Sequence, residues 1–252
     1  MPQSGLKTPE QIGEAPETNL DAFPPLPWAL PRAEVVQVTF EVDLDAALEL
    51  LPEQLTRPVP PYARIIVSRY TESPVGPYSE ALLLLAARFA MLPRNYVVAA
   101  VVSTEAAQDA YRDIWNLPIL TGSIDLQRSR TAGGSENIRA SVASTLPLAT
   151  IELPDAYAVE REMIRYDPLV SVRVRQGEAE VIQFSGAPVV HEARLAKGAV
   201  VNCHADDWSD PWYRLRSLNM ISASIAVVDL EMTAPVPQTL RSAAGAMGGG
   251  LP

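Results

Sequence analysis

The sequence has few lysines and only one cysteine. Lys7 and Lys197 are the two lysines, against eighteen arginines in 252 residues. Arginine cannot replace lysine in forming an imine, because its guanidinium stays protonated at any working pH. Neither lysine is well placed for such chemistry, since Lys7 lies in a polar start and Lys197 stands in Ala-Lys-Gly, which predicts a hairpin turn. The lone Cys203 excludes an intrachain disulfide and a cysteine-rich metal site.

Runs of basic residues and long apolar runs are missing too. The formal net charge is −10, which disfavours nucleic acid as a partner because a phosphate backbone requires a basic face. The apolar stretches 81–87 and 96–102 are too short to span a bilayer, and residues 1–19 lack the apolar core of a signal peptide. We therefore expect a cytoplasmic protein that binds neither nucleic acid nor membrane.

Motifs for cofactors and metals are also absent. The sequence has no Gly-x-Gly-x-x-Gly, no P-loop and no Gly-x-Ser-x-Gly elbow, which argues against nucleotide cofactors and serine-hydrolase chemistry. His191, in an alternating segment, is interpreted as structural. The segment 204–210 offers oxygen and nitrogen donors, but its spacing matches no standard metal site and favours a solvated acidic loop. We expect no cofactor and no metal.

The composition that remains is that of an ordinary globular protein. Hydrophobic residues make up 48% and charged residues 20%, and the length fits one large domain with a substantial core. Residues 1–33 contain several prolines and predict an extended leader, 34–241 a single domain, and 242–252 a glycine-rich tail that we expect to be disordered. Phe23 and Trp28 are expected to fix the leader on the body or on a partner subunit.

Hydrophobic patterning predicts many strands and a few helices. Strands are indicated over 36–42, 64–70, 78–89 and 96–103, with 92–95 separating the last two, and later over 181–184, 189–195, 199–203 and 222–231. Asp43 predicts the N-cap of a helix through residue 51, and Ser103 or Thr104 caps a second helix that ends before Pro118. Residues 156–164 could form another helix. The pattern predicts an α+β fold: a mostly antiparallel, curved or closed sheet with a few helices around a pocket.

Three segments follow the order of motifs in acetoacetate decarboxylases. Residues 35–55, ending in Leu-Pro-Glu-Gln-Leu, resemble that family's opening strand, helix and L-P-x-x-L. Gly-Pro-Tyr-Ser-Glu at 76–80 resembles its G-x-Y-x-E, and Tyr-Arg-Asp-Ile-Trp-Asn-Leu-Pro-Ile at 111–119 resembles its G-R-E-x-x-x-x-P-K. The resemblance to the acetoacetate decarboxylase superfamily is clearest over 35–119 and continues faintly to about residue 231. It implies a β-barrel or cone around a pocket, and an oligomer of identical subunits.

The resemblance also shows that the family's catalytic lysine is missing. That lysine would stand at Ile119, its neighbouring lysine at Leu120, and an acidic pocket residue near Ile65. In the family the lysine attacks the substrate ketone, and acetoacetate decarboxylase is the standard example of a lysine activated by a cationic neighbour. The resemblance therefore implies an apolar pocket floor and no decarboxylation through a Schiff base.

Other residues keep the polar character of the family's pocket. Glu80 matches the pocket glutamate and is a candidate general acid or base, although a solvent-facing glutamate at a strand end is the alternative. Arg32 and Arg112 are candidates to clamp a carboxylate or polarise an oxygen, with a structural ion pair as the more common role for Arg112. Tyr78 and Trp115 would form walls that contact the substrate.

Two function hypotheses follow. The first is an enzyme that reuses the decarboxylase cavity for lysine-independent chemistry, such as cyclisation, dehydration or isomerisation of a carbonyl-containing or polyene compound in biosynthesis of a natural product. In that hypothesis Glu80 moves a proton while Arg32 or Arg112 polarises an oxygen. The second is a non-catalytic protein of the same fold that binds a small molecule. A buried Glu80 beside a cavity would favour the first hypothesis.

Overall fold

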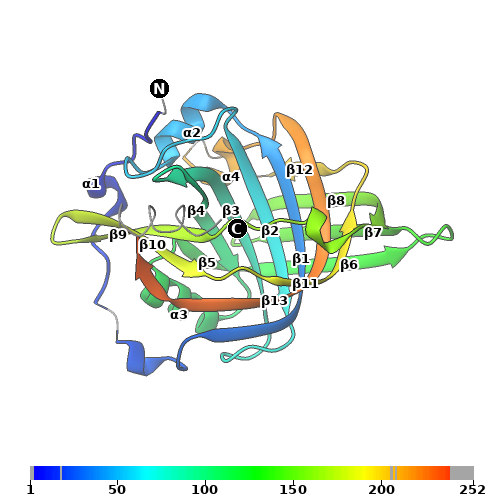
Figure 1. Cartoon of the computed structure of the whole chain (residues 1–252), viewed down its shortest axis with the longest axis horizontal. Coiled ribbons are helices and arrows are strands. Elements are labelled where there is room, and N and C mark those ends of the chain that lie inside the picture. The colour runs from blue at the N-terminus through cyan, green and yellow to red at the C-terminus, as the bar shows by residue number, and fades with distance from the viewer. Residues whose placement is uncertain (1–2, 18, 205–206, 208, 239–252) are drawn as a thin grey trace, which may run out of the picture.

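The structure is a computed structural model that describes residues 3–17, 19–204, 207 and 209–238 (Figure 1). Its strands are β1 (Trp28–Glu41), β2 (Tyr62–Tyr70), β3 (Tyr78–Phe89), β4 (Leu92–Val102), β5 (Ile119–Thr121), β6 (Ser123–Arg130), β7 (Glu136–Ala143), β8 (Pro147–Ala158), β9 (Leu169–Arg175), β10 (Glu178–Ser185), β11 (Val189–Leu195), β12 (Val200–Cys203) and β13 (Asn219–Pro237). Its helices are α1 (Pro9–Ile12), α2 (Leu44–Leu50), α3 (Glu105–Trp115) and α4 (Pro211–Arg214), with 3-10 turns η1 (Leu20–Ala22) and η2 (Arg161–Met163).

The described strands form one large, mostly antiparallel sheet that closes into a ring. Neighbouring strands follow the order β1-β2-β3-β4-β9-β10-β13, and β1 pairs with β13 to close the ring. The sheet continues from β13 through β11, β8, β7 and β6, while β12 pairs with β8. The parallel pairs are β4 with β5, connected through α3, and β4 with β9. The predicted fold, a mostly antiparallel closed sheet with a few helices, is confirmed.

Alternating side chains of β1, β2 and β3 enter two separate apolar cores. Ile66 and Leu82 belong to the core that also contains the apolar residues of α3, and Glu80 has the same strand parity. We call this side of the sheet the Glu80 face. Ile65 and Leu83 belong to the core on the opposite face, which β6, β7 and β8 cover. Complete burial of one such side chain is worth about 1.5–3 kcal/mol, so strands buried on both faces stabilise the fold strongly.

Local capping signals explain the two longer helices. Asp43 accepts hydrogen bonds from the backbone N–H groups of Asp45 and Ala46 at 3.0 Å, as its predicted role at the start of α2 requires. Thr104 accepts from the N–H of Ala107 at the start of α3. Asn116 ends α3 in the left-handed conformation, with φ 52° and ψ 47°. Both predicted helices are therefore present where the sequence placed them.

Three local predictions were wrong because strand pairing extends further than the sequence pattern. Residues 92–95 belong to β4, since the chain reverses at Ala90 and Met91, which both have positive φ. Residues 156–164 form no α-helix, because Ala156 is fully buried in β8 and pairs with Glu136. Lys197 lies in no hairpin: β11 and β12 each pair with β8 rather than with each other.

The predicted leader is partly regular structure. It contains α1, and β1 begins at Trp28, so the expected boundary at residue 33 falls inside a strand. Trp28 is fully buried, and its Nε1 donates to the carbonyl of Pro24 at 3.0 Å, which fixes the leader on the body as expected. Residues 242–252 lie outside the described part of the chain. In the described ranges no helix is both long and apolar enough to cross a membrane.

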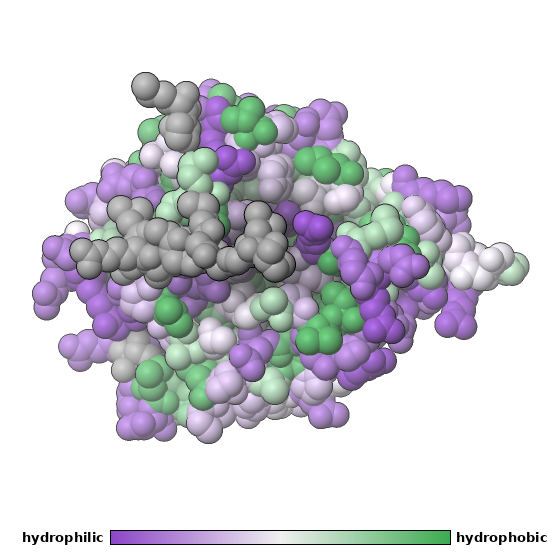
Figure 2. All heavy atoms as spheres, viewed as in Figure 1, coloured by the Kyte–Doolittle hydropathy of each residue, from purple (hydrophilic) through white to green (hydrophobic). Residues whose placement is uncertain are grey.

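The surface mixes polar and apolar residues. On the face drawn in Figure 2, hydrophobic residues lie in separate patches between hydrophilic ones rather than in one continuous area. Scattered apolar residues of this kind are normal for a folded protein surface.

Candidate functional site

The β2–β3 hairpin brings four polar side chains to the Glu80 face. Its pairing places Ser68 opposite Glu80 and Tyr70 opposite Tyr78, across a turn at 73–77. Side chains of directly opposite residues in an antiparallel pair lie on the same face of the sheet. The hairpin therefore brings together the carboxyl group of Glu80 and the hydroxyl groups of Ser68, Tyr70 and Tyr78. Helix α3 adds the hydroxyl group of Tyr111 to this cluster.

Two phenols donate to the Glu80 carboxyl group. Tyr111 Oη donates to Glu80 Oε2 at 2.6 Å, and Tyr70 Oη donates to Oε1. The hydroxyl of Tyr78 lies 2.8 Å from that of Tyr111, which extends the network by one phenol. The rings support these contacts, since Tyr70 and Tyr78 pack with centroids 4.8 Å apart. Glu80 is thus held by neutral donors from two elements.

Burial lets the Glu80 carboxyl group keep its proton to a higher pH than an ordinary glutamate. Its exposed fraction is only 4%, and this desolvation raises its pKa above the ordinary value. The hydrogen bonds from Tyr111 and Tyr70, together with the nearby hydroxyl of Ser68, oppose the rise because they stabilise the ionised form. Burial first, and the charge of Glu80 second, raise the pKa of Tyr111, so this phenol remains a donor.

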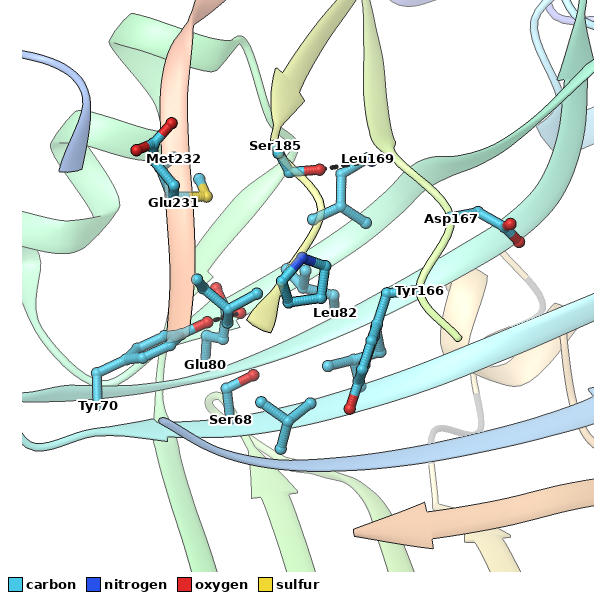
Figure 3. A pocket seen from close by; sticks show the side chains of 15 residues that line it. Ser68, Tyr70, Glu80, Leu82, Tyr166, Asp167, Leu169, Ser185, Glu231 and Met232 are labelled. Atoms are coloured by element: carbon cyan, nitrogen blue, oxygen red, sulfur yellow. Dashed lines mark hydrogen bonds between the residues drawn. The ribbon is translucent and has the colours of Figure 1, made fainter. Parts of the chain in front are cut away.

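Glu80 lines a small cavity (Figure 3). The cavity volume is about 40 Å³, room for about three waters at the ~10–15 Å³ that each requires. Its lining comes from β1, β2, β3, β9, β10, β13 and two connecting segments: Val35, Ile66, Ser68, Tyr70, Glu80, Leu82, Tyr166, Asp167, Leu169, Ser185, Gly186, Pro188, Leu230, Glu231 and Met232. Figure 3 shows the carboxylates of Asp167 and Glu231 pointing away from the cavity. Among the described lining residues, Glu80 is therefore the one whose carboxyl group faces the cavity.

Two lining hydroxyls are buried without an ordinary hydrogen bond in the described structure. Tyr166 Oη has no partner, and burial raises the pKa of this phenol. Ser68 Oγ lies close enough to Glu80 to lower the pKa of that carboxyl, but it makes no hydrogen bond of normal geometry. Buried polar atoms are almost always paired, so unpaired ones at a cavity are expected to meet a ligand or water.

Of the other predicted site residues, Tyr78 and Trp115 lie behind the cavity rather than on its surface. Tyr78 contacts Glu80 indirectly through Tyr111. Trp115 packs edge-on against Tyr111 with ring centroids 5.3 Å apart, and its Nε1 donates to the carbonyl of Thr233 at 2.8 Å. Both aromatics support the network from the core.

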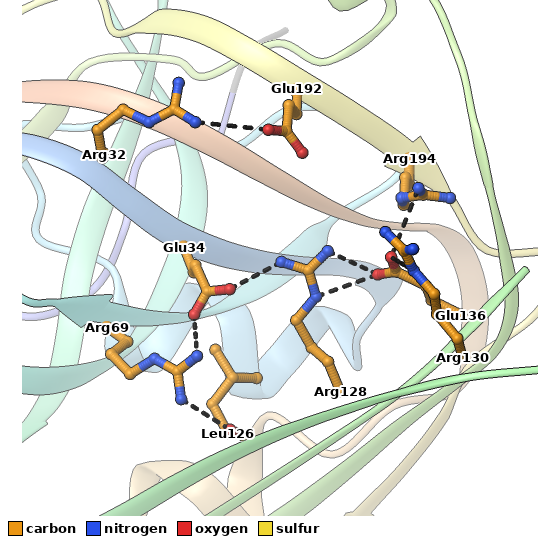
Figure 4. Close-up of polar contacts among 9 residues, drawn as sticks. All are labelled: Arg32, Glu34, Arg69, Leu126, Arg128, Arg130, Glu136, Glu192 and Arg194. Carbon is orange, nitrogen blue, oxygen red and sulfur yellow. Dashed lines mark hydrogen bonds and ion pairs between the residues drawn. The ribbon is translucent and has the colours of Figure 1, made fainter.

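The two candidate arginines do not reach the cavity. Arg32 lies in a bulge of β1 with φ 51°, where its N–H donates to Asp229 and its guanidinium pairs with Glu192 at 3.4 Å (Figure 4). Arg112 is half-exposed on α3 and pairs with Asp109 and Asp113 at 2.8 and 2.7 Å. The structure gives Arg112 the structural ion-pair role and brings neither guanidinium to Glu80.

The three apolar replacements separate in space. Ile119 is buried in the core of the Glu80 face, where β5 pairs it with Ala100 beside β3, but it does not line the cavity. Leu120 is 54% exposed, because adjacent residues of a strand point to opposite sides. Ile65 lies in the core of the opposite face, and its neighbour Ile66 lines the cavity instead. Most of the cavity wall is apolar, but Ile119, Leu120 and Ile65 are not part of it.

Neither lysine lines the Glu80 cavity. Lys197 is exposed between β11 and β12. Lys7 is half-buried at a separate hollow of about 150 Å³ beside Asn116, Leu117 and Pro118, and burial lowers the pKa of its ammonium. The leader thus brings this lysine closer to the end of α3 than its position in the sequence indicates.

Metal ligands are not gathered anywhere in the described ranges. No group of three or more His, Cys, Asp or Glu side chains there could hold a metal ion. His191 pairs with Asp229 at 2.8 Å on the surface of β11 and β13. His204 Nε2 lies 3.0 Å from Thr150 Oγ1, while residues 205, 206 and 208 of its loop lie outside the described residues.

Sequence reasoning missed four residues of the site: Ser68, Tyr70, Tyr111 and Tyr166. The hairpin alone contained a signal for two of them, since a turn at 73–77 between paired strands places Ser68 and Tyr70 opposite Glu80 and Tyr78. Tyr111 could be assigned only to an apolar helix face. Tyr166 lies in an irregular segment after η2, where no periodic pattern exists.

Comparisons with known proteins agree with this architecture. The acetoacetate decarboxylase (ADC) family matches residues 14–238. A structure titled "Structural Studies of Acetoacetate Decarboxylase" superposes with TM-score 0.74 at 19% identity, covering 86% of this chain and 91% of that one. The acetoacetate decarboxylase of Legionella pneumophila gives TM-score 0.74 at 14% identity, with coverages of 95% and 98%.

A biosynthetic enzyme has the same fold. The enduracididine biosynthesis enzyme MppR, solved with pyruvate, gives TM-score 0.73 at 16% identity and covers 87% of this chain and 93% of its own. No curated protein matches the chain by sequence. These identities establish a shared fold, and the family match over residues 14–238 establishes descent: the chain belongs to the acetoacetate decarboxylase family.

Proposed function

We propose that this protein is a small-molecule enzyme that transfers protons through Glu80 and forms no Schiff base. Its substrate is a carbonyl-containing or polyene intermediate of a biosynthetic pathway, and its reaction is a cyclisation, dehydration or isomerisation. The observation that carries the proposal is the buried Glu80 carboxyl group, which lines a cavity and is held by neutral phenols rather than by a cation.

Neutral partners keep the Glu80 proton available. A salt bridge to arginine would fix the carboxylate in its ionised form, whereas phenols lower its pKa less than burial raises it. A general acid or base works best when its pKa lies near the working pH. Tyr70 and Tyr111 hold both carboxyl oxygens, so the group is also oriented.

The chemistry needs one carboxyl group and a hydroxyl-lined wall. For isomerisation, ionised Glu80 accepts a proton from a carbon next to a carbonyl, the C–H electrons form the enolate, and protonated Glu80 returns the proton to another carbon. For dehydration, ionised Glu80 accepts a proton from the carbon next to a carbonyl to give the enolate, and protonated Glu80 then gives this proton to a hydroxyl group on the adjoining carbon. The enolate electrons form the C=C bond as the C–O bond breaks, and the hydroxyl group departs as water. Hydroxyl donors such as Tyr166 stabilise the negative charge that develops on the substrate oxygen.

The test is turnover of the compound that accumulates when the gene is deleted. We expect Glu80→Gln to retain fold and ligand affinity but to lower kcat by about a hundredfold or more, because glutamine keeps the shape and cannot transfer a proton. Unchanged turnover in this variant would remove Glu80 from the mechanism and leave cavity shape as the cause of catalysis.

A non-catalytic binding protein of the same fold is the second candidate. The observation that favours it is the position of Arg32 and Arg112, because no arginine of the described residues then lines the cavity to polarise a substrate oxygen. In that case Glu80→Gln changes affinity, and no compound is converted by the wild type. The cytoplasmic location and assembly into a homo-oligomer remain predictions.

A further inference from the structure

We propose that the cavity binds the uncharged, oxygen-bearing end of its ligand, a ketone, aldehyde or alcohol group, and rejects a carboxylate. The hydroxyl of Tyr166 is the hydrogen-bond partner of that ligand oxygen. This inference rests on the proposed function and names the substrate class of the same cavity.

The charges around the cavity exclude an anion. Among the described residues that line it, three are acidic and none is Lys, Arg or His. The charged groups of two acidic residues, Asp167 and Glu231, point away from the cavity (Figure 3), and Glu80 faces it. A carboxylate placed here would lose its water and gain no cation, beside a carboxyl group that can itself ionise. A neutral ketone, aldehyde or alcohol oxygen has no charge to desolvate and needs no cation as a partner.

The hydroxyl of Tyr166 is fixed in place but left without a partner. The residue that follows it, Asp167, forms an ion pair with Arg64 at 2.7 Å, and Arg64 also donates to the side chain of Asn95 at 2.9 Å. Asn95 donates to the backbone carbonyls of Asp167 and Pro168 at 3.3 and 2.9 Å. Arg64 and Asn95 thus hold the segment that carries Tyr166, while its own Oη is buried and has no hydrogen-bond partner among the described residues. This geometry is that of a donor prepared for a ligand acceptor.

The size of the cavity limits what enters it. About 40 Å³ holds a group of roughly three or four non-hydrogen atoms, by comparison with the ~10–15 Å³ that one water needs. Its walls are mostly aliphatic, including Val35, Ile66, Leu82 and Met232. A short ketone or hydroxyalkyl end of a larger molecule has this size and polarity.

The experiment compares acetone and acetamide, which are neutral, with acetate, which has nearly the same shape and one negative charge. Met232 lines the cavity, so protein labelled with ¹³C-methyl methionine reports binding through the Met232 signal, assigned with Met232→Leu. We expect acetone and acetamide to shift this signal in a saturable way and acetate to bind about a hundredfold more weakly or not at all. Acetate binding as tight as that of acetamide would overturn the proposal, and so would the absence of any shift with acetone.

Tyr166→Phe tests the hydrogen bond, with Tyr96→Phe as a matched buried control on the opposite face. We expect Tyr166→Phe to weaken acetone binding about two- to tenfold and to leave the Tm of the free protein unchanged or higher, since it removes an unpaired buried hydroxyl. Tyr96→Phe should leave acetone binding unchanged. Equal acetone affinity in wild type and Tyr166→Phe would contradict the role of Tyr166. These binding measurements need no turnover, so they can succeed or fail independently of the acid–base role of Glu80.

Discussion

Two glutamates of this protein have almost the same small exposed fraction, but their pKa values are shifted in opposite directions. Glu80 is 4% exposed and Glu136 is 3% exposed. The pKa of Glu80 is raised, whereas the pKa of Glu136 is lowered. The two lie on opposite faces of the ring sheet, and they differ in the chemistry of the groups that surround them.

Glu136 lies in a seam of arginines between the hairpin β6–β7 and strands β1, β2 and β11 (Figure 4). Arg128 donates from Nε and Nη2 to Glu136 Oε2 at 3.0 and 2.6 Å, and it also binds Glu34 at 2.7 Å. Arg194 adds a contact to Glu136 at 3.4 Å. These guanidinium groups more than offset the burial that would otherwise raise the pKa of Glu136.

The difference teaches that the partner, rather than burial alone, decides what a buried carboxyl group can do. Surrounded by arginines, Glu136 stays ionised to a lower pH than an ordinary glutamate and connects two parts of the sheet. Surrounded by phenols, Glu80 keeps a proton that can move. The ion pairs around Glu136 therefore have a structural role, whereas the hydrogen-bond network around Glu80 is the candidate functional site.

The largest expected effect on stability comes from Glu136. Glu136→Gln leaves Arg128 and Arg194 without their shared carboxylate, and we expect it to lower the free energy of unfolding by about 2–4 kcal/mol. Urea denaturation measures this loss. Glu152→Gln, which breaks the exposed contact with Arg139, is the control and should cost less than about 1 kcal/mol. A loss at Glu136 no larger than at Glu152 would show that the seam is not structural.

The two carboxyl groups should give stability opposite dependences on pH. A raised folded pKa means that the contribution of Glu80 is fully present below its unfolded pKa and is lost as pH rises through the folded value. The lowered pKa of Glu136 contributes stability above its unfolded pKa, and this is lost as pH falls through the folded value.

Over the range from about pH 2 to about pH 8, wild type should therefore lose stability relative to Glu80→Gln as pH rises above about 4.3, the ordinary glutamate pKa. It should gain stability relative to Glu136→Gln as pH rises up to about 4.3. The size of each change is about 1.4 kcal/mol for every unit by which the pKa is shifted. Denaturation curves of the three proteins across this range measure both slopes. Slopes of the same sign would mean that burial, and not the partner, controls both groups.

Removing one phenol should increase the difference between the pKa values of Glu80 and Glu136, with a smaller effect than the changes above. Tyr111→Phe deletes a hydrogen bond to ionised Glu80, so we expect the pKa of Glu80 to rise further, by about one unit. A ¹³C NMR titration of the glutamate carboxyl groups follows this shift directly. Tyr96→Phe, a buried tyrosine in the opposite core, should leave the Glu80 titration unchanged. A lower pKa in Tyr111→Phe would show that this phenol stabilises the protonated form.

The smallest expected effect is that of restoring one lysine. Ile119→Lys should not produce acetoacetate decarboxylation, because Leu120 points away from the core and no cation among the described residues lines the Glu80 cavity to hold a keto acid. Carbon dioxide release from acetoacetate measures this. The wild type incubated with acetoacetate and borohydride should likewise show no adduct by intact mass. Turnover by the variant, or an adduct on Lys7 or Lys197, would contradict the lysine-independent proposal.

Much of the fold and one site residue could be predicted from sequence. The alternation along β1 to β3, the caps Asp43 and Thr104, and the motif around Glu80 all depend on neighbours within a few residues. Local spacing fixes such features, because a strand repeats every two residues and a cap contacts the next turn of its own helix. The resemblance of residues 111–119 to the family's motif also predicts that Ile119 stands at the position of the Schiff-base lysine.

Only the tertiary structure decided which groups surround Glu80. Tyr111 comes from α3, and Tyr166 comes from an irregular segment far along the chain. Arg32 and Arg112, which the resemblance to the family suggested as pocket residues, form ion pairs with other carboxylates instead. The pKa of a carboxyl group depends on burial and on charges a few ångströms away in space, and neither is encoded by local periodicity. For this reason the sequence could name Glu80 as a candidate, but only the fold showed that its partners are phenols.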